Sequence, residues 1–530
     1  MSKDPIPYDL LSGLGTWAVT VLTVLVLGLF VASLVYLLLE GPCGIGTVFR
    51  GLLGGLADIA HTSSRRVWAL TQLTLKESIR RKTLGVIVVF GVCFLFAGWF
   101  LSSPEADPDM QVKVYVSFVL TAISWLILPA VFLLACWGLP EDIKARSLHT
   151  VVTKPVRRFE VIAGRVLGIV LVGTMVLLVM SGAGYLWLNR ALDSRAKEKL
   201  VARVPVYGEI TFTSRDGKPA AAGVNVGDVW AFRSYVEGNT QARAIWEFPN
   251  VTESRFPDDS LTLESSIQVF RTHKGDIESG VLAQYVFVNP ETGKSARLPA
   301  FPVREFRENI HEVPRELIDD SNQSVDLFRD LVQKDGTLRV EVFCLSSGQY
   351  LGMARPDLFI RQPDAPFAAS YFKAISGIWL MMTLVIVLGV TASSFAKGPV
   401  ATLLTFVFLV VGRIGLNFLN QLTSGTHEGG GPAESVYRIL LHMNPTVPLT
   451  KTPLTTTLEY IDKGFLGGLA ALKHVIPDFQ RYNFSEFTAN GFDVPWDAAL
   501  LPALALTIGF VIPCLVLGYF SLKARELESK

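Results

Sequence analysis

Three short motifs in the chain contain pieces of known catalytic or nucleotide-binding sites. Gly293-Lys294-Ser295 matches the end of GxxxxGK[ST], the loop that cradles nucleotide phosphates. Val288 stands where that loop needs its first glycine, so the tripeptide predicts a β-turn instead. His311-Glu312 and His427-Glu428 begin like a zinc-protease helix, but neither continues to a second histidine.

The rest of the sequence offers no set of residues for catalysis or metal binding. It has no GxSxG nucleophile elbow, and no long apolar run contains paired carboxylates. The five cysteines lack CxxC spacing and the seven histidines are dispersed, so we expect neither a zinc nor a copper site. A net charge of +1 does not indicate a nucleic-acid partner. We therefore expect a chain that is not an enzyme and holds no cofactor or metal.

The composition indicates a membrane protein. Half of the 530 residues are hydrophobic, 18% are charged and the mean hydropathy is +0.40. In a soluble domain, roughly a quarter of the residues are charged. A helix needs about 20 mostly apolar residues to cross a bilayer core. Runs of this kind lie at 14–40, 84–101, 112–138, 161–188, 371–395, 399–420 and 497–522.

The charges of the short loops predict the orientation, because Lys and Arg stay on the cytoplasmic side. The loop between the first two runs is strongly basic, whereas loop 102–111 has acidic residues and no basic one. Loop 139–160 and the C-terminal tail are basic again. The N-terminus is therefore expected outside, the C-terminus inside, and segments 189–367 and 421–496 on the outer face.

Segment 189–367 is polar enough to fold in water, and its apolar residues mostly alternate. Leu261, Leu263, Ile267 and Val269 follow this period of two, which predicts strands, whereas 321–334 has a helical period. We expect a β-sandwich with one or two short helices. Its aromatic residues are expected in the core, and the alternative is that they bind a ligand such as a glycan. These residues are Trp230, Trp246, Phe248 and Phe270.

Segment 421–496 contains two helical candidates, 433–442 and 454–475. The second begins with threonines and has an apolar face with small residues. The two helices either lie on or dip into the outer membrane surface, or pack as loop helices on the sandwich.

Two inner loops carry the positive evidence for function. Residues 65–82 predict an interfacial helix with an apolar and a basic side. The alternative is a basic anchor with no mechanical role. In loop 139–160, Pro140 is expected to open a short helix across the inner end of the spans, and Pro155 to end it. Such a helix, with both charge signs exposed, suits docking to another protein.

In these loops and in its last helix, the chain resembles a known family, the ABC type-2 transporter permeases. The resemblance rests on Thr153-Lys154-Pro155-Val156-Arg157-Arg158, on Gly164-Arg165-Val166-Leu167-Gly168 at a span start, and on the ending Gly518-Tyr519-Phe520 to Arg525-Glu526-Leu527. Helix 65–82 is similar to the elbow helix of that family. The extra first span and the outer domain resemble enlarged bacterial members grouped with copper-enzyme maturation permeases, although nothing in the sequence supports copper as cargo.

The resemblance implies a polytopic α-helical protein of the bacterial cytoplasmic membrane, with about seven spans and a β-rich domain inserted between core helices 3 and 4. The implied parts are 1–64 (extra helix and linker), 65–188 (elbow helix, core helices 1–3 and coupling loop), 189–367 (outer domain), 368–420 (core helices 4 and 5), 421–496 (outer loop helices) and 497–530 (core helix 6 and tail).

The implied function is that of the permease subunit of an exporter, coupled to a separate cytoplasmic ATPase that binds ATP and Mg. A homodimer is the simplest assembly, because two ATPases are needed. The expected coupling residues are Glu141, Asp142, Lys144, Arg146, Lys154, Pro155, Arg157 and Arg158. The expected elbow residues are Trp68, Lys76, Glu77, Arg80 and Arg81.

Arg413 lies inside the run 399–420, where an isolated charge costs at least about 2.5 kcal/mol. It either reaches the outer headgroups or lines a polar path with Asn417 and Asn420.

Two rival functions remain. One is a mechanical device that passes ATPase motion to an envelope partner through the outer domain, without transport. The other is a membrane-bound enzyme, which the missing catalytic residues disfavour.

Overall fold

The computed structural model describes residues 7–41, 43–80, 85–101, 107–144, 156–220, 222–224, 233–256, 260–272, 280–304, 307–319, 321–423, 430–444, 447 and 449–528. They form two compact units. One is helical and comprises Pro7–Lys199, Tyr371–Asn490 and Val494–Lys530. The other is rich in strands and includes Leu200–Ser370 and Gly491–Asp493.

Among its described residues, the helical unit contains six helical segments that are long and apolar enough to cross a membrane. They are Leu10–Leu38, Pro108–Asp142, Arg158–Ala191, Phe367–Phe395, Gly398–Thr423 and Trp496–Arg525. They confirm six of the seven predicted runs in length and composition. The seventh forms α4 (Gly85–Leu101), whose 17 residues reach only about 25 Å at 1.5 Å per residue.

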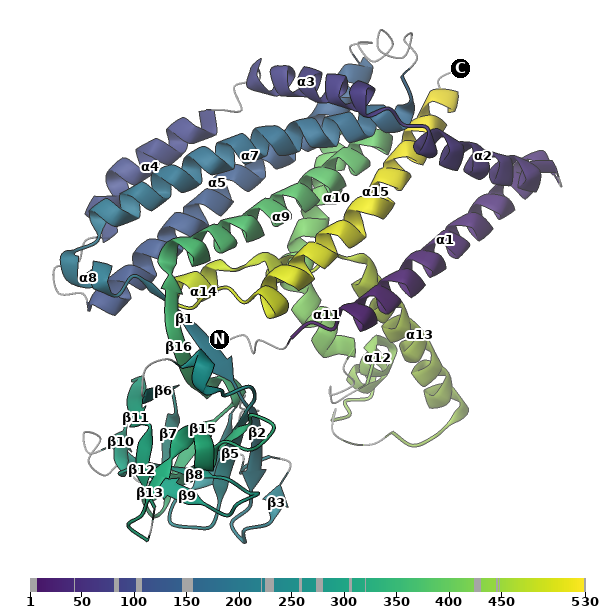
Figure 1. Ribbon diagram of the computed structural model, residues 1–530. Coiled ribbons are helices and arrows are strands. Elements are labelled where there is room, and N and C mark those ends of the chain that lie inside the picture. The colour runs from purple at the N-terminus through teal and green to yellow at the C-terminus, as the bar shows by residue number, and fades with distance from the viewer. Residues whose placement is uncertain are drawn as a thin grey trace. The chain divides into compact units, whose positions relative to one another are not determined.

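The helices of this unit appear in Figure 1. The first half of the chain forms α1 (Leu10–Glu40), α2 (Cys43–Ala60), α3 (Ser64–Arg80), α4, α5 (Pro108–Lys144), α7 (Arg158–Ala191) and α8 (Ser194–Glu198). The second half forms α9 (Phe367–Phe395), α10 (Gly398–Val410), the π-helix η5 (Val411–Gly415), α11 (Leu416–Thr423), α12 (Pro432–Leu440), α13 (Pro453–Val475), the 3-10 helix η6 (Phe479–Tyr482), α14 (Ser485–Ala489), the π-helix η7 (Trp496–Leu500) and α15 (Leu501–Glu528).

Two local predictions need correction. Pro140 does not begin a separate helix: it lies inside α5, which continues to Lys144. Proline is tolerated in a membrane helix because neighbouring groups satisfy the freed carbonyl. The region between the first two predicted spans was expected to contain one helix, but it contains α2 in addition to α3. The helical candidates 433–442 and 454–475 are confirmed as α12 and α13.

The part of the strand-rich unit that the structure describes forms four antiparallel sheets. The first has the order β1 (Val201–Tyr207), β16 (Leu358–Pro366), β6 (Ser260–Ser265), β11 (Asn309–Pro314). The largest has the order β10 (Phe301–Val303), β8 (Val281–Val288), β14 (Leu338–Cys344), β5 (Arg243–Phe248), β2 (Glu209–Thr213), β3 (Pro219–Ala220), with β9 (Ser295–Arg297) also paired to β8. The small sheets are β4 (Ser234–Glu237), β15 (Gln349–Met353), β7 (Gln268–Arg271), and β12 (Glu316–Ile318) with β13 (Ser324–Asp326).

One hydrophobic core joins the larger sheets. Leu261 and Leu263 of β6 lie in it with Trp246 and Phe248 of β5, so the period of two and the core aromatics are confirmed there. Phe270 is only partly buried, and Trp230 lies outside the described residues.

Other predictions for this unit have mixed outcomes. The helix expected at 321–334 is confirmed only in part: Leu327–Leu331 form a short π-helix, whereas Ser324–Asp326 form β13, because they pair with β12. Gly293 lies in the turn between β8 and β9 with a φ of +71°, which confirms the β-turn. His311 lies on β11 beside the rings of Phe301 and Tyr285.

Candidate coupling site

Helix α3 packs against the first turns of α7 through two glycines. A Cβ added at Gly164 would lie 2.6 Å from the Cβ of Leu70, and one at Gly168 would lie 2.5 Å from the Cβ of Thr74. The hydroxyl of Thr71 also donates a hydrogen bond of 3.3 Å to the Gly164 carbonyl. The spacing of four residues puts both glycines on one face, where they allow close approach of the two backbones.

A buried ion pair holds the N-terminal end of this contact. The Glu160 side chain of α7 is fully buried, and both Nε and Nη2 of Arg66 on α3 donate to it at 2.8 Å. The backbone N–H groups of Ser63 and Arg157 donate to the same carboxylate at 2.8 and 3.0 Å. These bonds raise the pKa of the Arg66 guanidinium. Both oxygens of the Glu160 carboxylate accept hydrogen bonds, and because the donors come from both helix starts, the carboxylate fixes the start of α3 to the start of α7.

A second ion pair connects α7 to the C-terminal end of α5. The guanidinium of Arg165 is almost fully buried and pairs with Asp142 of α5, and its Nη2 lies 3.8 Å from Glu77 of α3. Gly138 makes room for this group, since a Cβ there would overlap the guanidinium. Arg165 therefore joins α3, α5 and α7 at one point.

The same end of the helical unit also includes α2 and α15. Asp58 of α2 accepts a hydrogen bond of 2.8 Å from the Tyr519 hydroxyl of α15 and lies 3.5 Å from Arg157. A Cβ at Gly55 would lie 2.7 Å from the Phe520 ring, so α2 packs closely on α15. We call Asp58, Arg66, Glu77, Asp142, Arg157, Glu160 and Arg165 the inner cluster.

The predicted coupling residues fall into three groups. Asp142 and Arg157 belong to the inner cluster, and Arg158 is half-buried at the start of α7. Glu141 and Lys144 are exposed at the end of α5. Arg146, Lys154 and Pro155 lie outside the described residues.

The predicted elbow helix is α3, and it has three sides rather than two. Thr71, Thr74 and Ser78 form its buried side against α7. Trp68 is 55% exposed on the apolar side. Lys76 and Arg80 are exposed as well, whereas Glu77 contributes to the inner cluster. Arg81 lies outside the described residues.

Arg413 lies in the π-helix η5, where the helical span widens for one turn. Its carbonyl accepts a 2.6 Å hydrogen bond from Gln480, whose side-chain oxygen accepts a bond of 3.4 Å from Asn417. Gly412 permits this approach, because a Cβ there would lie 2.3 Å from the Pro477 carbonyl. The guanidinium of Arg413 is half-buried and forms no ion pair within the described residues. Asn420 is exposed on α11 and forms no side-chain bond to this group in the same part of the chain.

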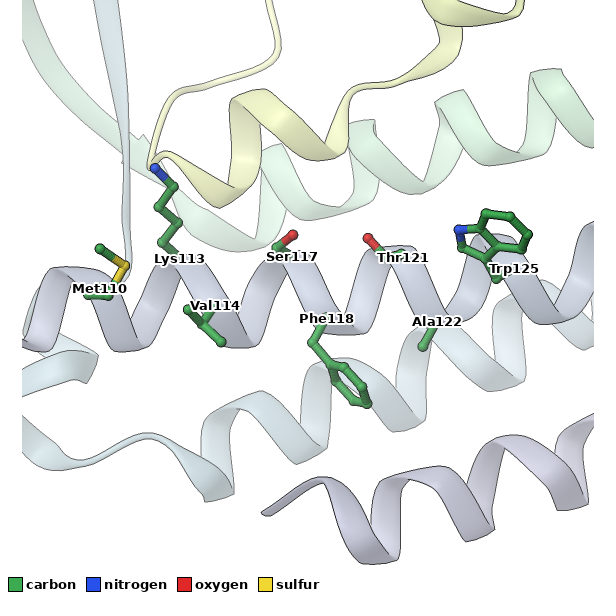
Figure 2. Close-up of a pocket in the computed structure, with 8 residues that line it drawn as sticks. All are labelled: Met110, Lys113, Val114, Ser117, Phe118, Thr121, Ala122 and Trp125. Atoms are coloured by element: carbon green, nitrogen blue, oxygen red, sulfur yellow. The ribbon is translucent and has the colours of Figure 1, made fainter. Parts of the chain in front are cut away.

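A shallow groove of about 520 Å³ runs along one side of α5. Figure 2 shows Lys113, Ser117 and Thr121 projecting to one side of the helix and Phe118 and Ala122 to the other. The groove is mostly apolar and belongs to a single helix. We assign it no site.

The cluster is built for ion pairing and close packing. In the described part of the chain, no three or more His, Cys, Asp or Glu side chains gather where they could hold a metal ion. The sequence reasoning missed the roles of Glu160, Arg165 and the two glycines. The glycine spacing on α7 and the Thr-Ser stripe on α3 were the available signals.

Comparisons of the chain with family models, with curated proteins and with solved structures found no match.

Proposed function

We propose that the chain is the membrane-spanning permease subunit of an ATP-driven exporter of the ABC type-2 class. A separate cytoplasmic ATPase docks at the end of α5 and on residues 145–155, which follow it. The six apolar helices support a place in the membrane. The sequence resemblance supports the family and the inward orientation of this end.

The observation that carries the proposal is the three-helix contact at Arg165. The exposed Glu141 and Lys144 lie within three residues of Asp142, which pairs with Arg165. Arg165 also faces Glu77 of α3. A push on the end of α5 would therefore move α3 and α7 with it, because the helices are joined by ion pairs and by glycine packing.

In this proposal the chain supplies the path across the membrane, and the partner ATPase binds and hydrolyses ATP with Mg. Two ATPases close on each other to do work, so two copies of this chain are expected. The permease passes the displacement to its spans as rigid-body movement of helices.

Co-purification of an ATPase with the full-length chain tests this proposal. We expect Glu141→Arg to reduce the amount of ATPase recovered at least several-fold while membrane insertion stays intact. Asp109→Arg is the matched control, because Asp109 is an exposed acid at the opposite end of the same helix. Equal recovery with both variants would contradict docking at Glu141.

A second candidate is mechanical transmission without transport. The observation that favours it is a pair of backbone hydrogen bonds between β1 and the chain segment before the last span. The backbone N–H of Arg203 on β1 donates to the Gly491 carbonyl at 2.7 Å, and Asp493 N–H donates back to the Arg203 carbonyl at 2.9 Å. The strand-rich unit thus holds a segment that is covalently continuous with η7 and α15. Deletion of 200–360 separates the candidates: export that survives favours transport, and loss of every phenotype without misfolding favours transmission.

A further inference from the structure

The helical hairpin of α12 and α13 buries three polar residues. Both helices are described throughout. The buried residues of α12 and α13 are Arg438, Thr455 and Asp462. Figure 1 shows the two helices side by side beyond α11. A helix pair folded for water buries mainly apolar side chains, whereas the fully buried side chains of these two helices are polar.

Each buried polar group is satisfied within the hairpin. The two carboxylate oxygens of Asp462 accept from the backbone N–H groups of Ala433 and Glu434, both at 2.8 Å, which caps the start of α12 from the neighbouring helix. Arg438 donates to Glu434 at 2.6 Å and to two backbone carbonyls of the connecting loop at 2.7 and 2.8 Å. The hairpin can therefore leave water without leaving these groups unpaired.

The outward side of α13 is an apolar stripe. Leu454, Ile461, Phe465 and Leu472 are separated by seven, four and seven residues, which places them on one helical face. Their exposed fractions are 46 to 56%. We call these four residues the α13 stripe.

The face of α13 opposite the stripe is charged. Lys463 and Glu459 form an ion pair of 2.7 Å there, and His474 is exposed near the C-terminal end. An apolar stripe opposite a charged face is the pattern of a helix lying in a membrane interface.

The stripe belongs to a larger apolar surface that includes a candidate membrane span. On α12, Val436, Ile439 and Leu440 are 56 to 72% exposed. On the span, Ile414 and Phe418 are 70% and 61% exposed, and α11 packs on α13 through Leu419, Leu469 and Ile476. The hairpin thus packs on the end of a candidate membrane span whose own apolar side chains are exposed.

We propose that α12 and α13 bind the lipid interface at the end of α11, with the α13 stripe among the acyl chains and Lys463 in water. Lipid fits this surface better than a protein partner does, because the surface joins that of a span and the charged residues lie opposite the stripe. The proposal does not depend on transport or on an ATPase.

Spin labels in the full-length chain test the proposal. The five native cysteines are replaced, and single cysteines are placed at Phe465 on the stripe and at Lys463 on the charged face. The protein is reconstituted in nanodiscs of phosphatidylcholine and phosphatidylglycerol. Collision with oxygen, which concentrates in lipid, is compared with collision with a water-soluble nickel chelate.

We expect the label at 465 to collide more with oxygen than with nickel and the label at 463 to show the opposite preference. Nickel-accessible labels at both positions would overturn the proposal. Protection of 465 from both reagents would also overturn it, in favour of a second copy of the chain. If the cysteine-free chain fails to fold, a carbene-forming lipid applied to the wild-type protein gives the answer: labelled peptides must include the α13 stripe, and their absence contradicts the proposal.

Discussion

Replacement of Gly168 by alanine tests whether α3 packs closely on α7. The added Cβ would lie 2.5 Å from the Cβ of Thr74 and 3.0 Å from the Thr71 carbonyl oxygen. Carbon atoms normally pack at about 3.5 to 4.0 Å, so the helices must separate by roughly 1 Å. One of the two contacts is with backbone, which a rotamer change cannot relieve.

The expected cost follows from the overpacking. Extra methyl groups in a packed contact cost about 1 to 3 kcal/mol. Alanine also favours a helix over glycine by up to about 1 kcal/mol, which offsets part of this cost. Gly182→Ala is the matched control, because Gly182 lies on the same helix with no atom within 4 Å of its added Cβ. We therefore expect Gly168→Ala to be less stable than Gly182→Ala by about 1 to 3 kcal/mol.

The assay is unfolding of the full-length chain in nanodiscs, followed for both variants and for the double variant Gly168→Ala with Thr74→Gly. Removal of the Thr74 side chain restores the space, so the double variant should recover part of the lost stability. Equal unfolding of Gly168→Ala and Gly182→Ala would refute the close packing of α3 on α7. Because glycine at position 74 itself costs up to about 1 kcal/mol in a helix, Thr74→Gly is also measured alone, and losses that simply add in the double variant would refute the assigned contact.

Three further predictions concern other parts of the chain. Burial raises the pKa of the Glu264 carboxyl from its ordinary value near 4.5 to about 7. Proton uptake by the folded state therefore stabilises the fold at pH 5, and this stabilisation is lost as the pH rises through about 7. Thermal unfolding should accordingly show lower stability at pH 8 than at pH 5. Glu264→Gln should remove this pH dependence. Arg233→Ala should destabilise the strand-rich unit by about 2 kcal/mol in denaturant unfolding, since it removes the two bonds of 2.6 and 2.8 Å to the buried Asp357 and leaves only that from the Ala354 N–H. Arg413→Ala should leave thermal stability within about 1 kcal/mol, because its guanidinium has no ion pair among the described residues, and a larger loss would reveal a partner.

The helical segments could be predicted from the sequence because hydropathy over 20 residues is a local property. Six predicted runs appear as long apolar helical segments, and α5 and α7 extend beyond their predicted ends because polar residues continue the helix. The strands 260–265 and 338–344 could also be predicted from the sequence, because a strand with one buried face has alternating apolar residues. Helix α2 was missed because its five glycines lower its helix propensity.

The inner cluster could not be predicted in the same way. Arg66 and Glu160 lie 94 residues apart, and nothing local to either shows that they pair. The glycines of α7 were noted as part of a motif, but their partners on α3 are Leu70, Thr71 and Thr74. The two-sided pattern predicted for that helix did not single out the side on which these residues lie. The surroundings of the α13 stripe could not be predicted either, because an apolar helix face has the same sequence pattern whether it faces a protein core or lipid.

The most direct test of the proposed coupling is to determine on which side of the membrane the C-terminal end of α5 lies. A single cysteine at Lys144, in a chain without its native cysteines, is treated with a membrane-impermeant maleimide in intact cells and after permeabilisation. A cysteine at Asp109, at the other end of α5, is the control. We expect Lys144→Cys to react only after permeabilisation and Asp109→Cys to react in intact cells. Reaction of Lys144→Cys in intact cells would place the inner cluster outside, where no ATPase could reach it, and would contradict the account.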